Sequence, residues 1–154
     1  MKFFFEKISV FIATGFGIGY LLPIGMGSLA ALIALFFVGQ FLGLSLLNQT
    51  LLILAGILAG AAVSFIAEKK FGKKDDHRIV IDEIVSVFIT FWALEYASIT
   101  VLIFGFILNR LFDIWKPFFI SRLQNLRGGW GIMFDDAASA VLSNIILRFI
   151  IFIF

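Results

Sequence analysis

Two adjacent carboxylates, Asp82 and Glu83, lie inside the apolar run Ile79–Val85. No neighbour along this run can satisfy a negative charge. A charged side chain within an apolar membrane segment costs about 2.5 to 3.5 kcal/mol at a helix centre, so such residues usually have a partner and a function. We therefore predict a functional role for this pair, with structural ion pairing as the alternative.

Two further segments add carboxylates close to basic residues and glycines. Asp113 follows Arg110 by three residues, which places both on one helix face, and a local ion pair worth about 0.2 to 0.5 kcal/mol is the simpler alternative. Asp135 and Asp136 follow a glycine-rich stretch at residues 128–131, whose backbone N–H groups could approach a phosphate. The two acids could instead cap the helix that follows them.

Together the three segments supply five acids and two basic residues, namely Asp82, Glu83, Asp113, Asp135, Asp136, Arg110 and Lys116. Carboxylates that converge without partners repel each other, so their convergence implies a divalent cation. The chain has no cysteine and one histidine, His77, which excludes thiolate and multi-histidine metal sites. All-oxygen ligation suits Mg²⁺, and the set predicts metal-assisted phosphoryl chemistry, with Arg110 and Lys116 neutralising the phosphate.

The composition places this chemistry in a membrane. The 154 residues are 62% hydrophobic and 14% charged, against about 25% charged residues in soluble domains. The mean hydropathy is +1.10. No charged side chain occurs from Ile8 to Ala67, a length sufficient for two bilayer crossings of about 20 residues each. A net charge of +2 is too small to suggest a nucleic-acid partner.

The pattern predicts an all-α, polytopic membrane bundle formed by one domain, residues 1–154. Glycines and Pro23 between residues 15 and 27 predict a short first helix followed by a bent or re-entrant loop, after which Ser28 is the expected N-cap. The remaining elements are expected at about residues 28–47, 51–67, 79–108 as a hairpin, and 137–154, with a turn at Asn48–Gln49.

Basic residues predict the orientation. Lys2, Lys7 and the basic stretches at 68–78 and 110–127 flank apolar segments, and the positive-inside rule places them in the cytoplasm together with nine of the ten acids. The exception is Glu95, for which we predict either an ion pair with Arg148 or separate snorkelling of both side chains. Four of the nine are expected to be solvated: Glu6, Glu68, Asp75 and Asp76.

The sequence resembles the phosphatidylglycerophosphatase A family, which removes the terminal phosphate of phosphatidylglycerophosphate. The matching stretches are Gly15–Gly17, Met26–Ala31, Ile79–Glu83, Arg110–Pro117 and Gly128–Asp136. The resemblance implies Mg²⁺ dependence, a bacterial inner-membrane location, and a pocket closed by Gly27, Ser28, Gly128 and Gly129. Family members usually have glycine and threonine where this chain has Ile24 and Gly25, and a second proline where it has Phe119.

Two other functions remain open from the sequence. Acids in membrane helices also mark ion paths, so a small cation transporter is one alternative. A transporter should carry its acids near mid-membrane, whereas here they crowd one edge, which favours lipid chemistry. The altered first glycine loop suggests the second alternative, a catalytically silent scaffold of the same family. Whether one acid acts as base or as nucleophile is also open.

Overall fold

The computed structural model describes residues 2–22 and 24–153, apart from the side chains of residues 2, 118 and 119. Predictions that concern Pro23 and Phe154, and those that concern the side chains of Lys2 and Phe119, lie outside the described part. Within it the chain is helical and contains no strand. The helices are α1 Lys2–Ala13, α2 Met26–Leu35, α3 Val38–Leu42, α4 Leu46–Phe71, α5 Ile81–Phe91, α6 Ile99–Trp115, α7 Phe118–Ser121 and α8 Gly129–Ile153, with 3-10 turns η1 Ile18–Tyr20 and η2 Leu123–Asn125. The predicted all-α fold is confirmed.

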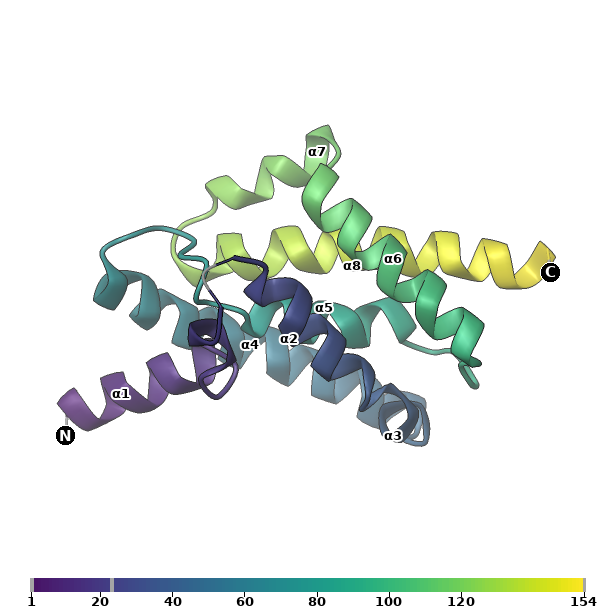
Figure 1. Cartoon of the computed structure of the whole chain (residues 1–154), viewed down its shortest axis with the longest axis horizontal. Helices are drawn as coiled ribbons and strands as arrows, with labels where there is room; N and C mark the ends of the chain where they lie inside the picture. The colour runs from purple at the N-terminus through teal and green to yellow at the C-terminus, as the bar shows by residue number, and fades with distance from the viewer. Residues whose placement is uncertain (1, 23, 154) are drawn as a thin grey trace.

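Two helices, α4 and α8, are long and apolar enough to cross a membrane. Their 26 and 25 residues correspond to about 39 and 37 Å at the helical rise, against a hydrocarbon core of about 30 Å. Both run along the long axis of the molecule, and the two chain ends lie at opposite ends of that axis (Figure 1). α5 and α6 form the predicted hairpin, with arms of 11 and 17 residues.

The bent N-terminal segment is present. After α1 the backbone turns through Gly15 and Gly17, whose φ angles of 58° and 95° are left-handed and favour glycine. The turn packs on the residues that precede α5, since the Val80 N–H donates to the Ala13 carbonyl at 2.9 Å. A Cβ at Gly19 would overlap the Arg78 carbonyl. The loop therefore supports the start of the helix that bears Asp82 and Glu83.

Several predicted boundaries are wrong. The helix expected at residues 28–47 is divided into α2 and the short α3, with a break at residues 36–37. α2 begins at Met26, preceded by Gly25 in the left-handed region, so Ser28 lies inside the helix and does not cap it. Asn48 and Gln49 do not form a turn, because the chain reverses earlier and α4 starts at Leu46. The cap of α4 is Ser45, whose side chain accepts a hydrogen bond from the Asn48 N–H at 3.3 Å.

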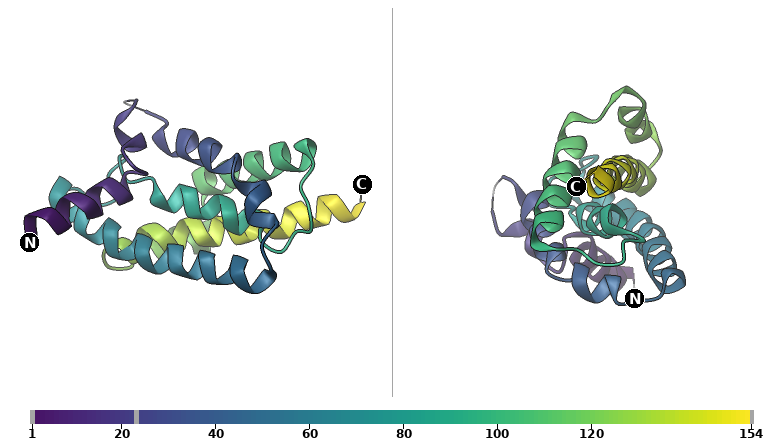
Figure 2. Two further views of the ribbon diagram at one scale, coloured as in Figure 1. Left: turned by 90° about the horizontal axis from the view of Figure 1, so that it is seen from below. Right: turned by 90° about the vertical axis from the view of Figure 1, so that its right-hand side faces the viewer.

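Helix α5 lies at the centre of the bundle and contacts α2, α4, α6 and α8 (Figure 2). Lipid offers no hydrophobic driving force between helices, so close packing through small residues must hold them together. Gly105 of α6 lies against the Phe91 ring, and Gly60 of α4 lies against Met133 of α8. A larger side chain at either glycine would require the facing side chain, or the helix itself, to move.

A buried polar network also joins α5 to α6 and α8. The Asn109 amide donates to the hydroxyls of Ser86 and Thr90 at 3.1 and 3.0 Å. The Asn144 amide donates to the carbonyls of Thr90 and Trp92. This network begins one turn after Glu83, so it fixes the rotation of α5 and thereby the direction of the acids at its start.

The predicted ion pair between Glu95 and Arg148 is absent from the salt bridges of the described residues. Arg148 instead donates from Nε to the Asn144 amide oxygen at 2.9 Å and from a terminal nitrogen to the Trp92 carbonyl at 2.7 Å. Both charged residues line one cavity at this end of the bundle. Glu95 and Arg148 therefore lie at the same end of the bundle, but this shared position does not bring them into direct contact.

Candidate active site

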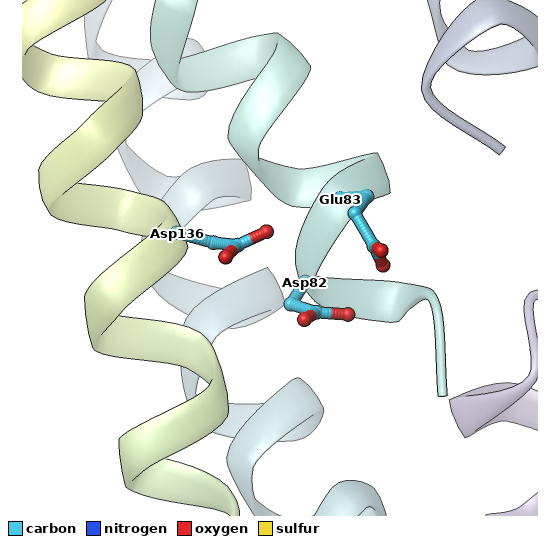
Figure 3. A group of neighbouring side chains, drawn as sticks. All are labelled: Asp82, Glu83 and Asp136. Atoms are coloured by element: carbon cyan, nitrogen blue, oxygen red, sulfur yellow. The ribbon is translucent and has the colours of Figure 1, made fainter. Parts of the chain in front are cut away.

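Three carboxylates from two helices converge in the interior of the bundle. Asp82 and Glu83 belong to the first turn of α5, and Asp136 belongs to α8. One oxygen from each lies within 4.8 Å of the others, close to the roughly 4.2 Å between opposite ligands of an octahedral Mg²⁺. Figure 3 shows Asp136 pointing from α8 toward α5, where the other two acids lie.

The oxygens of this group are poorly satisfied by the protein. Asp82 and Asp136 are only 6% and 3% exposed. Asp82 Oδ1, Glu83 Oε2 and Asp136 Oδ2 are buried, and none has a hydrogen-bond partner among the described residues. Unpaired buried carboxylates are very costly, so this arrangement requires a cation or bound protons. An all-oxygen donor set of this kind fits Mg²⁺.

The other two predicted acids lie beside basic residues. Arg110 contacts the Asp113 carboxylate at 2.8 Å, and the ammonium of Lys116 lies 2.5 Å from Asp135. Lys116 also lies 3.4 Å from both Asp113 and Asp136, so it joins the basic residues to the three-carboxylate group. Asp113 and Asp135 lie outside the group of three acids whose oxygens are within 4.8 Å of one another, and their predicted role as metal ligands stays a prediction.

The backbone at the end of α6 directs Lys116 into the site. Its φ of 38° is in the left-handed region, and the following Pro117 disfavours continuation of the α-helix. Burial alone would lower the pKa of the Lys116 ammonium, but the three surrounding carboxylates raise it above its ordinary value. Lys116 thus stays positively charged at physiological pH and can attract an anionic group.

Helix α2 closes one side of the site through Gly27. A Cβ at this position would overlap the carboxylate of Glu83. Only glycine allows α2 to approach so closely, and the contact limits the positions that the Glu83 side chain can take. Gly27 therefore positions a candidate ligand. The neighbouring Ser28 is exposed, and its predicted contact with substrate stays a prediction.

The comparison with known families agrees with this geometry. A model of the family described as Phosphatidylglycerophosphatase A matches residues 11–151, which include the whole site. The chain belongs to the phosphatidylglycerophosphatase A family.

Three similar proteins each match most of the chain. Phosphatidylglycerophosphatase A of Escherichia coli is 37% identical over 142 residues, which are 90% of this chain and 81% of the relative. The protein of the same name from Haemophilus influenzae is 35% identical, over 88% and 84% of the two chains. A putative phosphatidylinositol-3-phosphatase of Bacteroides thetaiotaomicron is also 35% identical, over 91% of each. No solved structure matches the chain.

The last matching stretch of the family, Gly128–Asp136, differs from its expected structure. α8 begins at Gly129, so Asp135 and Asp136 lie inside the helix and are not its caps. A Cβ at Gly128 would meet the Phe65 ring, and one at Gly129 would meet the Ala61 carbonyl, so both glycines allow α8 to pack on α4. Phosphate binding by these two glycines stays a prediction.

Two acids that were expected to be solvated have specific surroundings. Asp76 is 3% exposed, and the Arg78 guanidinium contacts its carboxylate at 2.7 Å. Asp75 is exposed but lines a pocket of about 220 Å³ together with Asp135, at the margin of the site. Residue types could not distinguish them from a solvated loop, and closeness to Asp82 along the chain was the only available signal.

Proposed function

We propose that this protein hydrolyses the terminal phosphate of phosphatidylglycerophosphate, in a Mg²⁺-dependent reaction that yields phosphatidylglycerol and inorganic phosphate. One observation carries the proposal: three close carboxylates have unpartnered buried oxygens beside the ammonium of Lys116. Membership of the family supports a lipid phosphate monoester as the substrate. The names of two relatives indicate phosphatidylglycerophosphate in particular.

Asp82, Glu83 and Asp136 would hold the Mg²⁺. The bound ion would polarise the phosphoryl oxygens and lower the pKa of a bound water. Lys116 and Arg110 would bind the phosphate and neutralise the charge that develops on it, and Asp113 would hold the Arg110 guanidinium in place. Gly27 would keep the Glu83 carboxylate in position.

Asp135 is suited to the transfer of a proton. One of its oxygens contacts Lys116, while the other, Oδ1, is buried and has no partner among the described residues. That free oxygen could accept a proton from an attacking water as the water oxygen bonds to phosphorus and the bond from phosphorus to the glycerol oxygen breaks. The glycerol oxygen would take up a proton, delivered by the protonated Asp135 or by solvent, to become the hydroxyl of phosphatidylglycerol. Direct attack by a carboxylate is the alternative, and trapping of a phosphoaspartate would support it.

We further propose that the protein lies in a bacterial inner membrane with this site facing the cytoplasm. The proposal is supported by α4 and α8, the two helices with sufficient length and apolarity to span a bilayer. Exposed lysines end α4 and continue into the loop before α5, as expected for a cytoplasmic edge. Acids at the same edge could reach a lipid head group without drawing it into the hydrocarbon region.

The direct test is phosphate release by the purified full-length protein from phosphatidylglycerophosphate. We expect activity with Mg²⁺, loss of activity with a chelator, and recovery when Mg²⁺ is restored. Asp82→Asn and Asp136→Asn should each lower kcat/KM about 100-fold or more. Glu6→Gln, which removes an acid that pairs with Lys70 elsewhere on the surface, is the matched control and should leave activity unchanged.

The alternatives predict different results in the same assay. A transporter or a silent scaffold would release no phosphate from any lipid. The relative named as a phosphatidylinositol-3-phosphatase makes phosphatidylinositol 3-phosphate the most informative second substrate. A higher kcat/KM for that lipid than for phosphatidylglycerophosphate would overturn the proposed substrate while retaining the proposed chemistry.

A further inference from the structure

A large cavity lies at the end of the bundle opposite the acids. Its volume is about 1000 Å³, and it is formed by the α5–α6 connection, the start of α6 and the last turns of α8. Arg148 follows Asp136 by twelve residues on α8, which places it about 18 Å further along the helix. The cavity is therefore separate from the three-carboxylate group. In Figure 1 it corresponds to the end that contains the C-terminus.

Two opposite charges line this cavity without contacting each other. Glu95 and Arg148 both line it, yet no salt bridge joins them among the described residues. Neither one takes part in any other ion pair of the described part of the chain. Both side chains are exposed, so each charge is accessible from the cavity. A ligand that carries both signs of charge could therefore contact the two residues together.

The arginine belongs to a built site and is not a freely snorkelling side chain. Its Nε donates to the Asn144 amide oxygen at 2.9 Å, and Asn144 is itself held by the Thr90 carbonyl at 2.9 Å. A terminal nitrogen of Arg148 donates to the Trp92 carbonyl at 2.7 Å. These bonds use two of the five N–H donors of a guanidinium, so the orientation is fixed while donors and a full positive charge remain available.

The remaining wall is suited to a hydrocarbon chain. Its apolar residues are Val101, Phe104, Leu147, Ile150 and Ile151, on two helices that flank the cavity. Small polar groups, including those of Ser98 and Thr100, lie beside the charged residues. An amphipathic molecule with an apolar tail and a dipolar head therefore matches the distribution of polarity along the cavity.

From this complementarity we propose that the cavity binds a phospholipid whose head group carries a primary ammonium. The lipid phosphate would contact Arg148, and the ammonium would donate hydrogen bonds to Glu95. A quaternary ammonium has no N–H to donate, so an otherwise identical choline lipid should bind more weakly. This site is independent of the proposed hydrolysis, since none of its residues belongs to the acid cluster.

The test is retention of lipid by the purified full-length protein, measured by native mass spectrometry at equal concentrations of phosphatidylethanolamine and phosphatidylcholine with matched acyl chains. We expect the wild type to retain the ethanolamine lipid at least about 5-fold more than the choline lipid. Arg148→Gln should reduce retention of both about 10-fold, and Arg148→Lys should restore part of it. Lys69→Gln removes an exposed cation at the opposite end and should change neither.

A second variant separates lipid binding from a purely structural role of Arg148. Glu95→Gln replaces the carboxylate with an uncharged amide of the same size at an exposed position, so folding should be unaffected. It should abolish the preference for ethanolamine while leaving retention of the choline lipid unchanged. Equal retention of the two lipids by the wild type, or an unchanged preference in Glu95→Gln, would overturn the proposal.

Discussion

Among single residues, Lys116 has the most contacts with the acids of the candidate active site. Its ammonium lies within 3.4 Å of three carboxylates, two of which do not belong to the close ligand group. It therefore offsets the repulsion among the acids before any other cation is bound. The same ammonium is the nearest positive charge available to a phosphate that approaches the Asp136 carboxylate.

Replacement of Lys116 should separate these two roles. Lys116→Gln removes the charge, so kcat should fall about 100- to 1000-fold through loss of phosphate stabilisation. Without divalent ions the variant should lose about 3 to 5 kcal/mol of unfolding free energy, because its carboxylates lack their partner. Added Mg²⁺ should then raise the Tm of the variant more than that of the wild type.

The control for this experiment is Lys73→Gln, which removes an exposed lysine from the loop between α4 and α5. It should leave both kcat and the Mg²⁺-dependent change in Tm unaltered. Wild-type turnover in Lys116→Gln would rule out the phosphate-binding role.

Asp76 gives a prediction about pH. Hydrogen bonds from the Arg78 guanidinium lower the pKa of Asp76 below its ordinary value, even though burial opposes this shift. A lowered folded-state pKa means that the ionised carboxylate stabilises the fold. That stability is fully present above the unfolded pKa of about 3.9 and is lost as the pH falls through the lower folded value.

Asp76→Asn should therefore destabilise the protein by about 1.5 to 3 kcal/mol between pH 5 and 7. Below about pH 4 the difference between the two proteins should shrink, because the wild-type carboxyl becomes protonated as well. Thermal unfolding of both proteins across this pH range provides the measurement. A difference that stays constant down to pH 2.5 would show that the ion pair is not responsible.

At the scale of elements, the approach of α2 to α5 depends on one glycine. A Cβ at Gly27 would overlap the Glu83 carboxylate, whereas Gly39 of α3 has no atom within 4 Å of such a Cβ. Both glycines lie in helices, so alanine can be introduced at a closely packed position, Gly27, and at an open position, Gly39, and the effects can be compared.

Gly27→Ala should displace Glu83 or α2, which costs about 1 to 3 kcal/mol of stability and lowers kcat at least about 10-fold. Gly39→Ala should be neutral or stabilising by up to about 1 kcal/mol, because alanine favours the helix. Thermal unfolding and phosphate release measure both effects. Equal behaviour of the two variants would show that the Gly27 contact does not position Glu83.

The boundaries of elements were the weakest part of the prediction from sequence. Apolar periodicity and length identified the hairpin and the two long helices α4 and α8, since these signals extend over many residues. The helix expected at residues 28–47 was wrong, because the chain breaks there into α2 and α3. Asn48 and Gln49 looked like a turn, but in the structure Gln49 is buried and accepts a hydrogen bond from the Ala93 N–H at 3.0 Å. Short polar pairs cannot reveal whether they face solvent or a distant backbone group.

The composition of the candidate site was more predictable than its internal arrangement. Charge cost within an apolar run identified Asp82 and Glu83, and the glycine-rich stretch before it identified Asp136; the structure brings the three together. The spacing indicated a local pair of Arg110 with Asp113, which the structure contains. Sequence could not show that Lys116 contacts Asp135, because that contact depends on how the end of α6 meets α8. Asp76 was misjudged, since it is buried beside Arg78, whereas Asp75 is exposed as expected.

At the scale of the whole molecule, the chain offers a direct test of its orientation. It contains no cysteine, so a single introduced thiol can be labelled without background. Lys73 and Tyr96 are exposed and lie in the connections at opposite ends of α5. On the proposed orientation, Lys73→Cys should react with an impermeant maleimide only when the cytoplasmic face is accessible.

Tyr96→Cys should show the opposite pattern, with labelling from outside the inner membrane. If bound lipid shields the Tyr96→Cys thiol from the maleimide, the thiol should still be labelled after the protein is denatured. Labelling after denaturation is therefore the control for shielding. Labelling of both thiols from the same face would contradict the multi-pass arrangement.

The shortness of α5 has a consequence for the membrane itself. Its 11 residues extend about 16 Å, roughly half of a hydrocarbon core, so α5 alone does not cross a bilayer. Asn144 donates to the Trp92 carbonyl and Gln49 accepts from the Ala93 N–H, so the backbone polar groups just after α5 are satisfied by neighbouring helices. On the proposed orientation, the acids at the start of α5 meet head groups of one leaflet only. Phosphatidylglycerol would thus be produced asymmetrically, and its supply to the other leaflet would depend on its movement across the bilayer.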